Sequence, residues 1–349
     1  MSMEKKKILI LGANGFIGSS LVWKLLKQTD YDIVGFDIAD GKLGNVLGRE
    51  RFAFRKVDVL KDKSAVEAAV KDCDIVLPLV AVATPALYVK DPVRVYNLDF
   101  ESNVDIIKMC LKYGKRVIFP STSEVYGMCP DAAFDEYTSK LVLGPIEKER
   151  WIYSCIKQML DRLIWAYGKH EGLQFTLFRP FNFIGPRLDD IKAHKEGSSR
   201  VITQFAHNIL NGKPIKLVNG GLQKRCFTFI DDGVDCITRI IRNENGCADG
   251  KIFNIGNPAE EHSVKELAEV LVAEFKNYPE YAALAEKTVI ETVSGDEYYG
   301  AGYQDADRRV PSIEQAKSVL GWTPKTDFKT SIKLILDYHL LGKDYEAGV

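Results

Sequence analysis

The stretch Gly12-Ala13-Asn14-Gly15-Phe16-Ile17-Gly18 directly follows the apolar run Lys7-Ile8-Leu9-Ile10-Leu11. The apolar run predicts a buried strand, and the residues after the glycine-rich turn predict an amphipathic helix. In such a turn Gly12 permits a tight bend, Gly15 lets the backbone approach a pyrophosphate, and Gly18 lets the helix pack closely on the strand. The free N–H groups and the positive dipole end of the helix then favour a bound anion.

A carboxylate ends the next predicted strand, Tyr31–Asp37. Asp37 lies 19 residues after Gly18, where an acidic side chain accepts hydrogen bonds from the adenosine ribose hydroxyls of a dinucleotide. A ribose phosphate would be repelled there, so the sequence predicts NAD rather than NADP. Asp58, at the end of a third predicted strand, is placed to reach the adenine edge. The alternative is a structural glycine turn beside a surface aspartate. The predicted cofactor-binding residues are Gly12, Asn14, Gly15, Phe16, Ile17, Gly18, Asp37 and Asp58.

Predicted strands alternate with predicted helices over the first half of the chain. The further strands are expected at 74–80, 116–120 and 174–179, and the helices at 61–71, 92–113 and 151–170. This alternation predicts an α/β fold with a doubly wound parallel sheet of the Rossmann type, which binds ligands at the carboxyl ends of its strands. We expect a dinucleotide-binding domain over 1–180 and a smaller mixed α/β substrate domain over 181–349, with the chain crossing between the two.

The composition excludes several classes of protein. The 349 residues carry a net charge of −1, which gives no positive field to hold a nucleic acid. The longest apolar run, near 75–83, is too short to span a membrane, and the N-terminus lacks the apolar stretch of a signal peptide. The seven cysteines and five histidines show no metal-ligand spacing. We therefore expect no metal, free thiols and a cytoplasmic location.

A phenol and an amine stand four residues apart in Tyr153-Ser154-Cys155-Ile156-Lys157. On a helix this spacing places both side chains on one face. The amine is expected to lower the phenol pKa from about 10 and so to make Tyr153 a base for a hydroxyl proton. Such a pair also occurs by chance on amphipathic helices. The segment Thr122-Ser123-Glu124, after the strand at 116–120, adds two hydroxyls and a carboxylate at the same edge of the sheet.

The glycine turn, the strand-end Thr122-Ser123 pair and the Tyr153/Lys157 pair together resemble the extended short-chain dehydrogenase/reductase family. The resemblance covers nearly the whole chain and implies a nucleotide-sugar substrate. Residues 179–187 are similar to the family's substrate-binding turn, and residues 220–228 to its second phosphate-binding segment. Guanidinium groups suit the fork geometry of a diphosphate, although a surface ion pair is the alternative for any one arginine.

Within this family, residues 119–129, 150–154 and 302–313 are similar to the decarboxylase domain of bifunctional polymyxin-resistance enzymes. This implies NAD-dependent oxidative decarboxylation of UDP-glucuronate to UDP-4-keto-pentose and carbon dioxide. The implied catalytic residues are Thr122, Ser123, Glu124, Tyr153, Lys157 and Arg309. The implied UDP-sugar site consists of Ala83, Tyr88, Arg150, Asn182, Arg200, Lys216, Arg225 and Tyr303.

Several alternatives stay open at this point. Glu124 could merely cap a local N–H group, and Arg309 could pair with Asp305 or Asp307. A redox-neutral UDP-xylose synthase, an epimerase or dehydratase, and a non-catalytic NAD-sensing protein all remain candidates. The bifunctional enzymes carry a formyltransferase domain ahead of the decarboxylase domain, and from this chain we expect no formyltransferase activity. The family resemblance further implies a homodimer formed by the helix with the Tyr153/Lys157 pair and the long helix before it.

Overall fold

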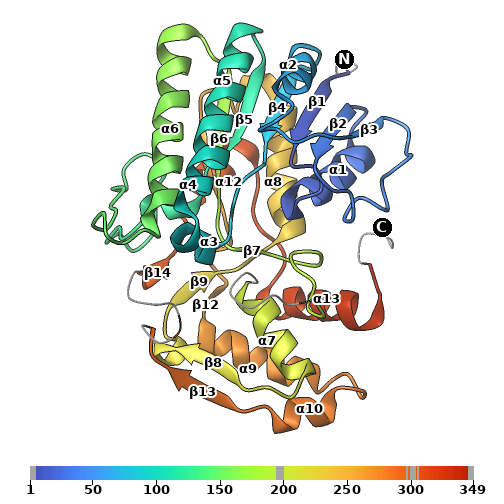
Figure 1. The fold of residues 1–349 in the computed structure, drawn as a ribbon, viewed down its shortest axis with the longest axis vertical. Coiled ribbons are helices and arrows are strands. Elements are labelled where there is room, and N and C mark those ends of the chain that lie inside the picture. Colours follow the sequence, from blue (N-terminus) through green and yellow to red (C-terminus); the bar gives the residue numbers. More distant parts are fainter. Residues whose placement is uncertain (1–4, 194–199, 296–297, 299–303, 305, 345–349) are drawn as a thin grey trace.

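The computed structural model describes residues 5–193, 200–295, 298, 304 and 306–344. Among these residues seven strands form one parallel sheet, in the order β11-β6-β5-β4-β1-β2-β3 (Figure 1). The strands are β1 (Lys7–Leu11), β2 (Asp32–Asp37), β3 (Phe52–Lys56), β4 (Ile75–Pro78), β5 (Arg116–Pro120), β6 (Phe175–Pro180) and β11 (Ile252–Ile255). The order of connection reverses between β1 and β4. Such a switch point opens a crevice at the carboxyl ends of the strands, where this class of sheet binds ligands.

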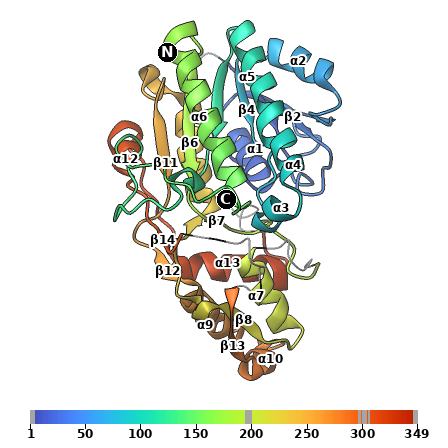
Figure 2. The ribbon, with the colours of Figure 1, turned by 60° about the vertical axis from the view of Figure 1, so that its left-hand side comes forward.

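Helices cover both faces of this sheet (Figures 1 and 2). One face carries α1 (Phe16–Gln28), α8 (Ile230–Arg242) and α12 (Glu314–Leu320). The other face carries α2 (Lys63–Lys71), α5 (Ser102–Lys112) and α6 (Trp151–Glu171). Because both faces are covered, β1 is apolar at every buried position rather than alternating with polar residues.

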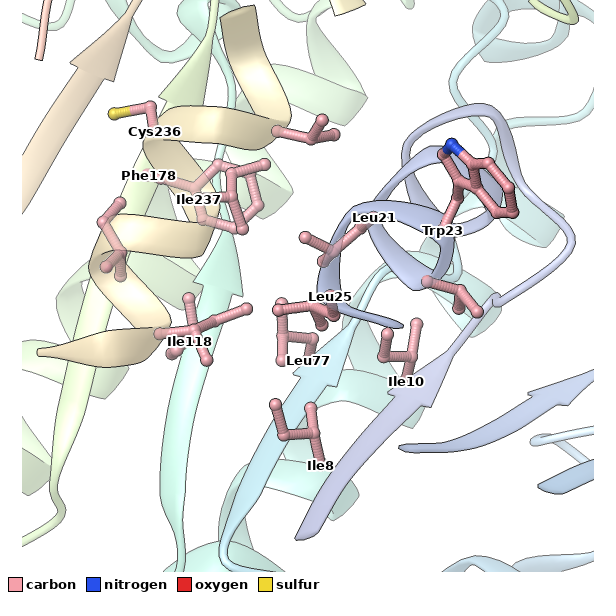
Figure 3. Close-up of a cluster of buried hydrophobic side chains, with 14 of the residues drawn as sticks. Ile8, Ile10, Leu21, Trp23, Leu25, Leu77, Ile118, Phe178, Cys236 and Ile237 are labelled. Atoms are coloured by element: carbon pink, nitrogen blue, oxygen red, sulfur yellow. The ribbon is translucent and has the colours of Figure 1, made fainter. Parts of the chain in front are cut away.

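The core between α1, α8 and the sheet is shown in Figure 3. Leu21 and Leu25 of α1 and Ile237 of α8 point toward Ile10 and Leu77 of the central strands. Successive side chains of a strand point to opposite faces, so Ile8 and Ile10 enter this cluster while Leu9 and Leu11 enter the cluster on the other face. This packing fixes the end of β1 and hence the turn that follows it.

The long helix expected at 92–113 changes its hydrogen-bonding pattern along its length. It begins as α4 (Pro92–Val95), continues as a π-helical stretch (Tyr96–Glu101) and ends as α5. Pro92 occupies the first helical position, where its missing N–H costs nothing, and the Asp91 carboxylate caps the helix by accepting from the Arg94 N–H at 3.2 Å. π-Helical turns are rare and often mark functional sites.

A smaller mixed region lies next to the carboxyl ends of the large sheet (Figure 1). Its own apolar core includes Phe205, Leu267, Leu271 and Ile332. Its helices are α7 (Val201–Leu210), α9 (Val264–Phe275), α10 (Ala282–Lys287) and α13 (Phe328–Leu341). Its short strands are β7 (Phe183–Ile184), β8 (Ile215–Val218), β9 (Lys224–Cys226), β10 (Thr228–Phe229), β12 (Glu261–Ser263), β13 (Ile290–Val293) and β14 (Arg308–Arg309). The chain returns from this region to the large sheet at α8 and β11.

None of the helices in the described part of the chain is long and apolar enough to cross a membrane. Within the same described residues, no group of three or more histidine, cysteine, aspartate and glutamate side chains is arranged to hold a metal ion.

Candidate active site

The glycine turn after β1 leaves no room for side chains. Gly12 has a φ of +89°, in the left-handed region that glycine tolerates. A Cβ on Gly18 would lie 2.2 Å from the Gly12 carbonyl oxygen, and one on Gly15 would lie 3.1 Å from it. Gly15 is the N-cap of α1 and has no side chain to cap the helix, so the first N–H groups of the helix stay available to a ligand. The backbone of this cradle has the shape that the sequence predicts for an anion site.

Asp37 lies against this turn. Its Oδ2 accepts the Asn14 N–H at 2.9 Å and its Oδ1 accepts the Ile38 N–H at 2.7 Å. The carbonyl of Asp37 accepts the Val57 N–H at 2.9 Å. Asp58, the next residue, therefore lies near Asp37. Asp58 itself accepts the Leu60 N–H at 3.0 Å.

These contacts fit a dinucleotide. The cradle around Gly12, Gly15 and Gly18 accommodates a pyrophosphate only because it lacks Cβ atoms. A carboxylate at Asp37 suits ribose hydroxyls and opposes a ribose phosphate. The partly buried Phe16 packs on the core beside the turn, as does Ile17. The residues present therefore fit NAD.

Tyr153 and Lys157 lie on one face of α6, beneath the end of β5. Both side chains are buried. The ammonium of Lys157 donates to the Pro120 carbonyl at 2.8 Å, and its Nζ lies 5.9 Å from the centre of the Tyr153 ring. Thr122, the N-cap of a 3-10 helix at Ser123–Tyr126, accepts the Glu124 N–H at 3.2 Å. The side chain of Thr122 also forms a hydrogen bond with Tyr153, so the turn brings these two predicted residues together.

The pKa of Tyr153 differs from the sequence expectation. Burial raises the pKa of the phenol above its ordinary value, and the negative charges of Asp99 and Glu124 raise it further. A hydrogen bond with Thr122 and the charge of Arg200 oppose this rise. The sequence indicated a lowered pKa because it showed the amine but not the burial. Without NAD the phenol therefore keeps its proton.

Tyr88 is the residue that covers Tyr153. It belongs to α3 (Pro85–Lys90), which follows the loop after β4, and its ring is stacked on that of Tyr153 with centroids 4.6 Å apart and planes 7° apart. Burial raises the pKa of Tyr88 well above its ordinary value, so this phenol also stays neutral. Ala83 lies exposed in the loop that leads to α3.

Glu124 joins the two regions of the molecule through two arginines. Its Oε2 lies 2.8 Å from Nη1 of Arg150, the N-cap of α6, and its Oε1 lies 2.5 Å from Nη1 of Arg309 in β14. Arg150 is 1% exposed and Arg309 is 3% exposed. Arg309 therefore pairs with Glu124 across the molecule. Two guanidinium groups converge on the end of β5, next to Thr122.

The other predicted substrate residues belong to the smaller region or to the segments that lead into it. Asn182, between β6 and β7, has a φ of +40° and donates from its side chain to the Cys226 carbonyl at 3.4 Å. Arg225 lies opposite Arg309 in the register of the parallel strands β9 and β14. Arg200 forms an ion pair with Asp189 at 2.6 Å, and Lys216 is exposed on β8.

Ser123 is buried in its 3-10 helix. Tyr303 lies outside the described residues. Its neighbour Gln304 accepts a hydrogen bond from the indole of Trp151 at 3.0 Å, at the start of α6. Gln304 therefore contacts the helix that bears Tyr153.

A buried polar network lies behind Lys157 and was not predicted from the sequence. The carboxylate of Asp161 accepts from Arg179 at 2.9 Å and from the Ser121 hydroxyl at 2.8 Å. Arg179 also donates to the hydroxyl of Tyr126 at 2.9 Å. Asp161 stands four residues after Lys157, so extending the Tyr153/Lys157 spacing by one more helical turn would have found it.

Comparisons with known proteins identify the family of this chain. The model of the NAD dependent epimerase/dehydratase family matches residues 8–256. The PbgP3 protein from Burkholderia pseudomallei is 50% identical in sequence, with a TM-score of 0.87 over 96% of this chain and 97% of that chain.

Two more distant structures share the fold. UDP-glucuronic acid 4-epimerase from Bacillus cereus, in complex with UDP-glucuronic acid and NAD, is 22% identical with a TM-score of 0.79, over 97% of this chain and 100% of that chain. The dTDP-glucose 4,6-dehydratase from Bacillus anthracis, in complex with NAD, is 22% identical with a TM-score of 0.77, over 97% of each chain. The predicted Rossmann-type fold, NAD as cofactor and the resemblance to extended short-chain dehydrogenase/reductases are confirmed. The chain belongs to the NAD dependent epimerase/dehydratase family.

Proposed function

We propose that this enzyme oxidatively decarboxylates UDP-glucuronate with NAD and forms UDP-4-keto-pentose and carbon dioxide. The observation that carries the proposal is the convergence of Arg150 and Arg309 on Glu124, beside Tyr153. Two buried guanidinium groups at a substrate site attract a carboxylate, whereas a neutral sugar has no charge for them to pair with. The sequence similarity of this region to decarboxylases supports the same substrate.

The first chemical step is removal of the proton from the hydroxyl on carbon 4 of the sugar. NAD, when bound, supplies the acceptor for the hydride that leaves carbon 4. Tyr153 accepts the proton as a phenolate, a charged form that the Lys157 ammonium and the positive nicotinamide of bound NAD would favour over the neutral phenol. Thr122 and Ser123 hold the oxygen by hydrogen bonds. Because burial favours the neutral phenol, the proton accepted by Tyr153 is retained.

The second step uses the new carbonyl. The ketone at carbon 4 is β to the carboxylate that carbon 5 bears. When the bond between carbon 5 and the carboxylate breaks, its electron pair moves into an enolate at carbons 4 and 5, and carbon dioxide leaves. Carbon 5 then takes a proton, and the pair Glu124 and Arg309 assists both events. Taking a bare carboxylate from water into an apolar site costs tens of kcal/mol in a Born estimate, so the arginines make its binding feasible.

The direct test mixes the protein with NAD and UDP-glucuronate and follows NADH absorbance, carbon dioxide and the NMR spectrum of the product. One NADH per carbon dioxide, with a 4-keto-pentose product, is expected. Carbon dioxide with little NADH indicates a redox-neutral UDP-xylose synthase instead. If neither carbon dioxide nor NADH forms, the proposal is wrong.

Tyr153→Phe separates chemistry from cofactor binding. The ring is kept and only the proton acceptor is lost, so turnover is expected to fall by about 10²- to 10⁴-fold. The Kd for NAD, measured by calorimetry, is expected to stay within about twofold of wild type. An unchanged rate contradicts the role of Tyr153.

We also propose a homodimer formed through α6 and the helix of α4 and α5. Exposed residues at helical spacing run along α6, including Cys155, Met159 and Arg162. Val93 and Tyr96 are exposed on the neighbouring helix. Sedimentation of wild type and Met159→Glu tests this: a dimer that the charge dissociates is expected, and a wild-type monomer overturns it.

A further inference from the structure

Asp99 is a fully buried carboxylate that the mechanism above does not use. It lies in the π-helical stretch between α4 and α5 and is 0% exposed. Its Oδ1 accepts the Val82 N–H at 2.8 Å. Among the residues that the structure describes, its Oδ2 is buried without a hydrogen-bond donor. A buried carboxylate with one oxygen lacking a hydrogen bond is costly unless a cation lies nearby.

Helix α6 packs against the π-helical stretch, and the cation of α6 that acts on Asp99 is Lys157. Burial raises the pKa of Asp99 to about 6, and the charge of Lys157 opposes this rise. Lys157 is 1% exposed, and its Nζ lies 4.7 Å from the centre of the Phe119 ring. One of its three N–H donors binds the Pro120 carbonyl. Burial lowers the pKa of the Lys157 ammonium, while the charges of Asp99 and Asp161 raise it.

The two carboxylates around Lys157 differ in what else they bind. Asp161 is already paired with Arg179 at 2.9 Å and accepts the Ser121 hydroxyl. Asp99 accepts a hydrogen bond from one backbone N–H and is not paired with an arginine in the described part of the chain. Its negative charge is therefore available to balance the Lys157 ammonium. The titratable groups that face Asp99 are Lys157 and Tyr153 from α6 and Tyr88 from α3.

We infer that Asp99 is a positioning residue: its carboxylate keeps Lys157 an ammonium ion and, through Val82, holds the loop that leads to α3. The inference rests on the proposed role of Tyr153 as base. The negative charge of Asp99 by itself disfavours a phenolate at Tyr153, and the ammonium of Lys157 favours one. Together the two charges cancel near the phenol. Without Asp99, the fully buried Lys157 loses its proton, and Tyr153 loses the cation that stabilises its charged form.

The test follows the titration of Lys157 by NMR in protein labelled with ¹³C-lysine, without ligand or turnover. Lys157→Met identifies the signal by its loss. Asp99→Asn keeps an oxygen for the Val82 N–H and removes the charge. The titration midpoint of Lys157 is expected to fall by about one pH unit or more. Because no substrate is used, this result stands apart from the fate of the proposed function.

Two further variants complete the design. Glu274→Gln neutralises another buried carboxylate, on α9 in the smaller region, and is expected to leave the Lys157 midpoint unchanged. Asp99→Ser removes the charge with a smaller side chain and serves if Asp99→Asn does not fold. A Lys157 midpoint equal to wild type in either folded Asp99 variant overturns the inference. So does wild-type Lys157 that is already neutral at pH 7, a result that needs no variant.

Turnover provides a second readout. In Asp99→Asn, kcat is expected to fall about tenfold at pH 8 and to recover to within about threefold of wild type at pH 6, where Lys157 regains its proton. KM is expected to stay constant. A fall of equal size at every pH indicates a purely structural role and overturns the inference.

Discussion

The cofactor side and the substrate side of the site share one edge of the sheet but are built differently. The cofactor side comes from residues 12–37, and its decisive features are absent Cβ atoms and one partly exposed carboxylate. The substrate side is assembled from β5, α6 and β14, and Glu124 and Arg309 are separated by 185 residues in sequence. The first depends on backbone shape and the second on buried charge. Changes in volume should therefore damage one side and changes in charge the other.

Arg309→Met gives the largest expected effect, because it removes a buried charge and nearly conserves volume. Release of carbon dioxide is expected to fall about 10³-fold, since one of two guanidinium groups for the carboxylate is lost. Single-turnover measurement of carbon dioxide checks this. NAD affinity should not change.

Arg308→Met is the matched control for that substitution. Arg308 precedes Arg309 in β14 but pairs with Glu261 and is half exposed. Its loss is expected to change turnover by less than about twofold, because exposed ion pairs contribute little. Equal losses in the two variants would mean that β14 matters as a strand and not through the charge of Arg309.

Gly18→Ala tests the opposite side by volume alone. The added Cβ would lie 2.2 Å from the backbone oxygen of Gly12, so α1 must move away from the turn. The Kd for NAD, measured by calorimetry, is expected to rise about 100-fold. Gly41→Ala is the control, since a Cβ there meets nothing within 4 Å. Unchanged NAD binding in Gly18→Ala would break the distinction between the two sides.

Glu136→Gln sharpens the contrast through pH, because Glu136 is buried next to the polar network behind Lys157, where its carbonyl accepts from Arg179 at 3.3 Å. Burial raises the pKa of Glu136 to about 7, although a hydrogen bond from the Asn254 N–H opposes the rise. A carboxyl with a raised folded pKa contributes stability below its ordinary pKa of about 4.5 and loses it as pH rises through about 7. The free energy of unfolding of the variant is therefore expected to match that of wild type below pH 4.5 and to exceed it by about 3 kcal/mol at pH 8.5. Thermal unfolding at several pH values measures this difference. If the stabilities of variant and wild type change with pH in parallel, the prediction is wrong.

The same contrast explains what the sequence could predict. The glycine turn, Asp37 and the Tyr153/Lys157 pair are local patterns, since strand, turn and helix periods place them without knowledge of the rest. The pairing of Arg309 with Glu124 has no local signal, because Asp305 and Asp307 stand closer in sequence. Tertiary structure alone brings Arg309 to Glu124.

Burial was the other quantity that the sequence did not reveal. The direction of the Tyr153 pKa depends on Tyr88, which reaches it from another helix. β11 was not predicted because it has only four residues and pairs with β6 from a distant part of the chain. One sequence feature could have indicated that Asp99 is buried: it stands between Leu98 and Phe100 in a predicted helix.

Asp37→Asn gives the smallest expected effect and tests the one charge on the cofactor side. Asparagine keeps one oxygen for the Asn14 N–H and loses the acceptor of the Ile38 N–H, which is exposed and can bind water instead, so the turn should stay folded. The ribose hydroxyls lose a charged acceptor, and the Kd for NAD is expected to rise about tenfold. The repulsion of a ribose phosphate also disappears, so the Kd for NADP should fall and the preference for NAD should narrow. Asp58→Asn is the control: Asp58 already pairs with Lys61 at 3.1 Å, so its loss should leave the NAD to NADP ratio within about threefold of wild type. If Asp37→Asn leaves that ratio unchanged, cofactor choice comes from the shape of the turn, and the cofactor side depends on backbone geometry throughout.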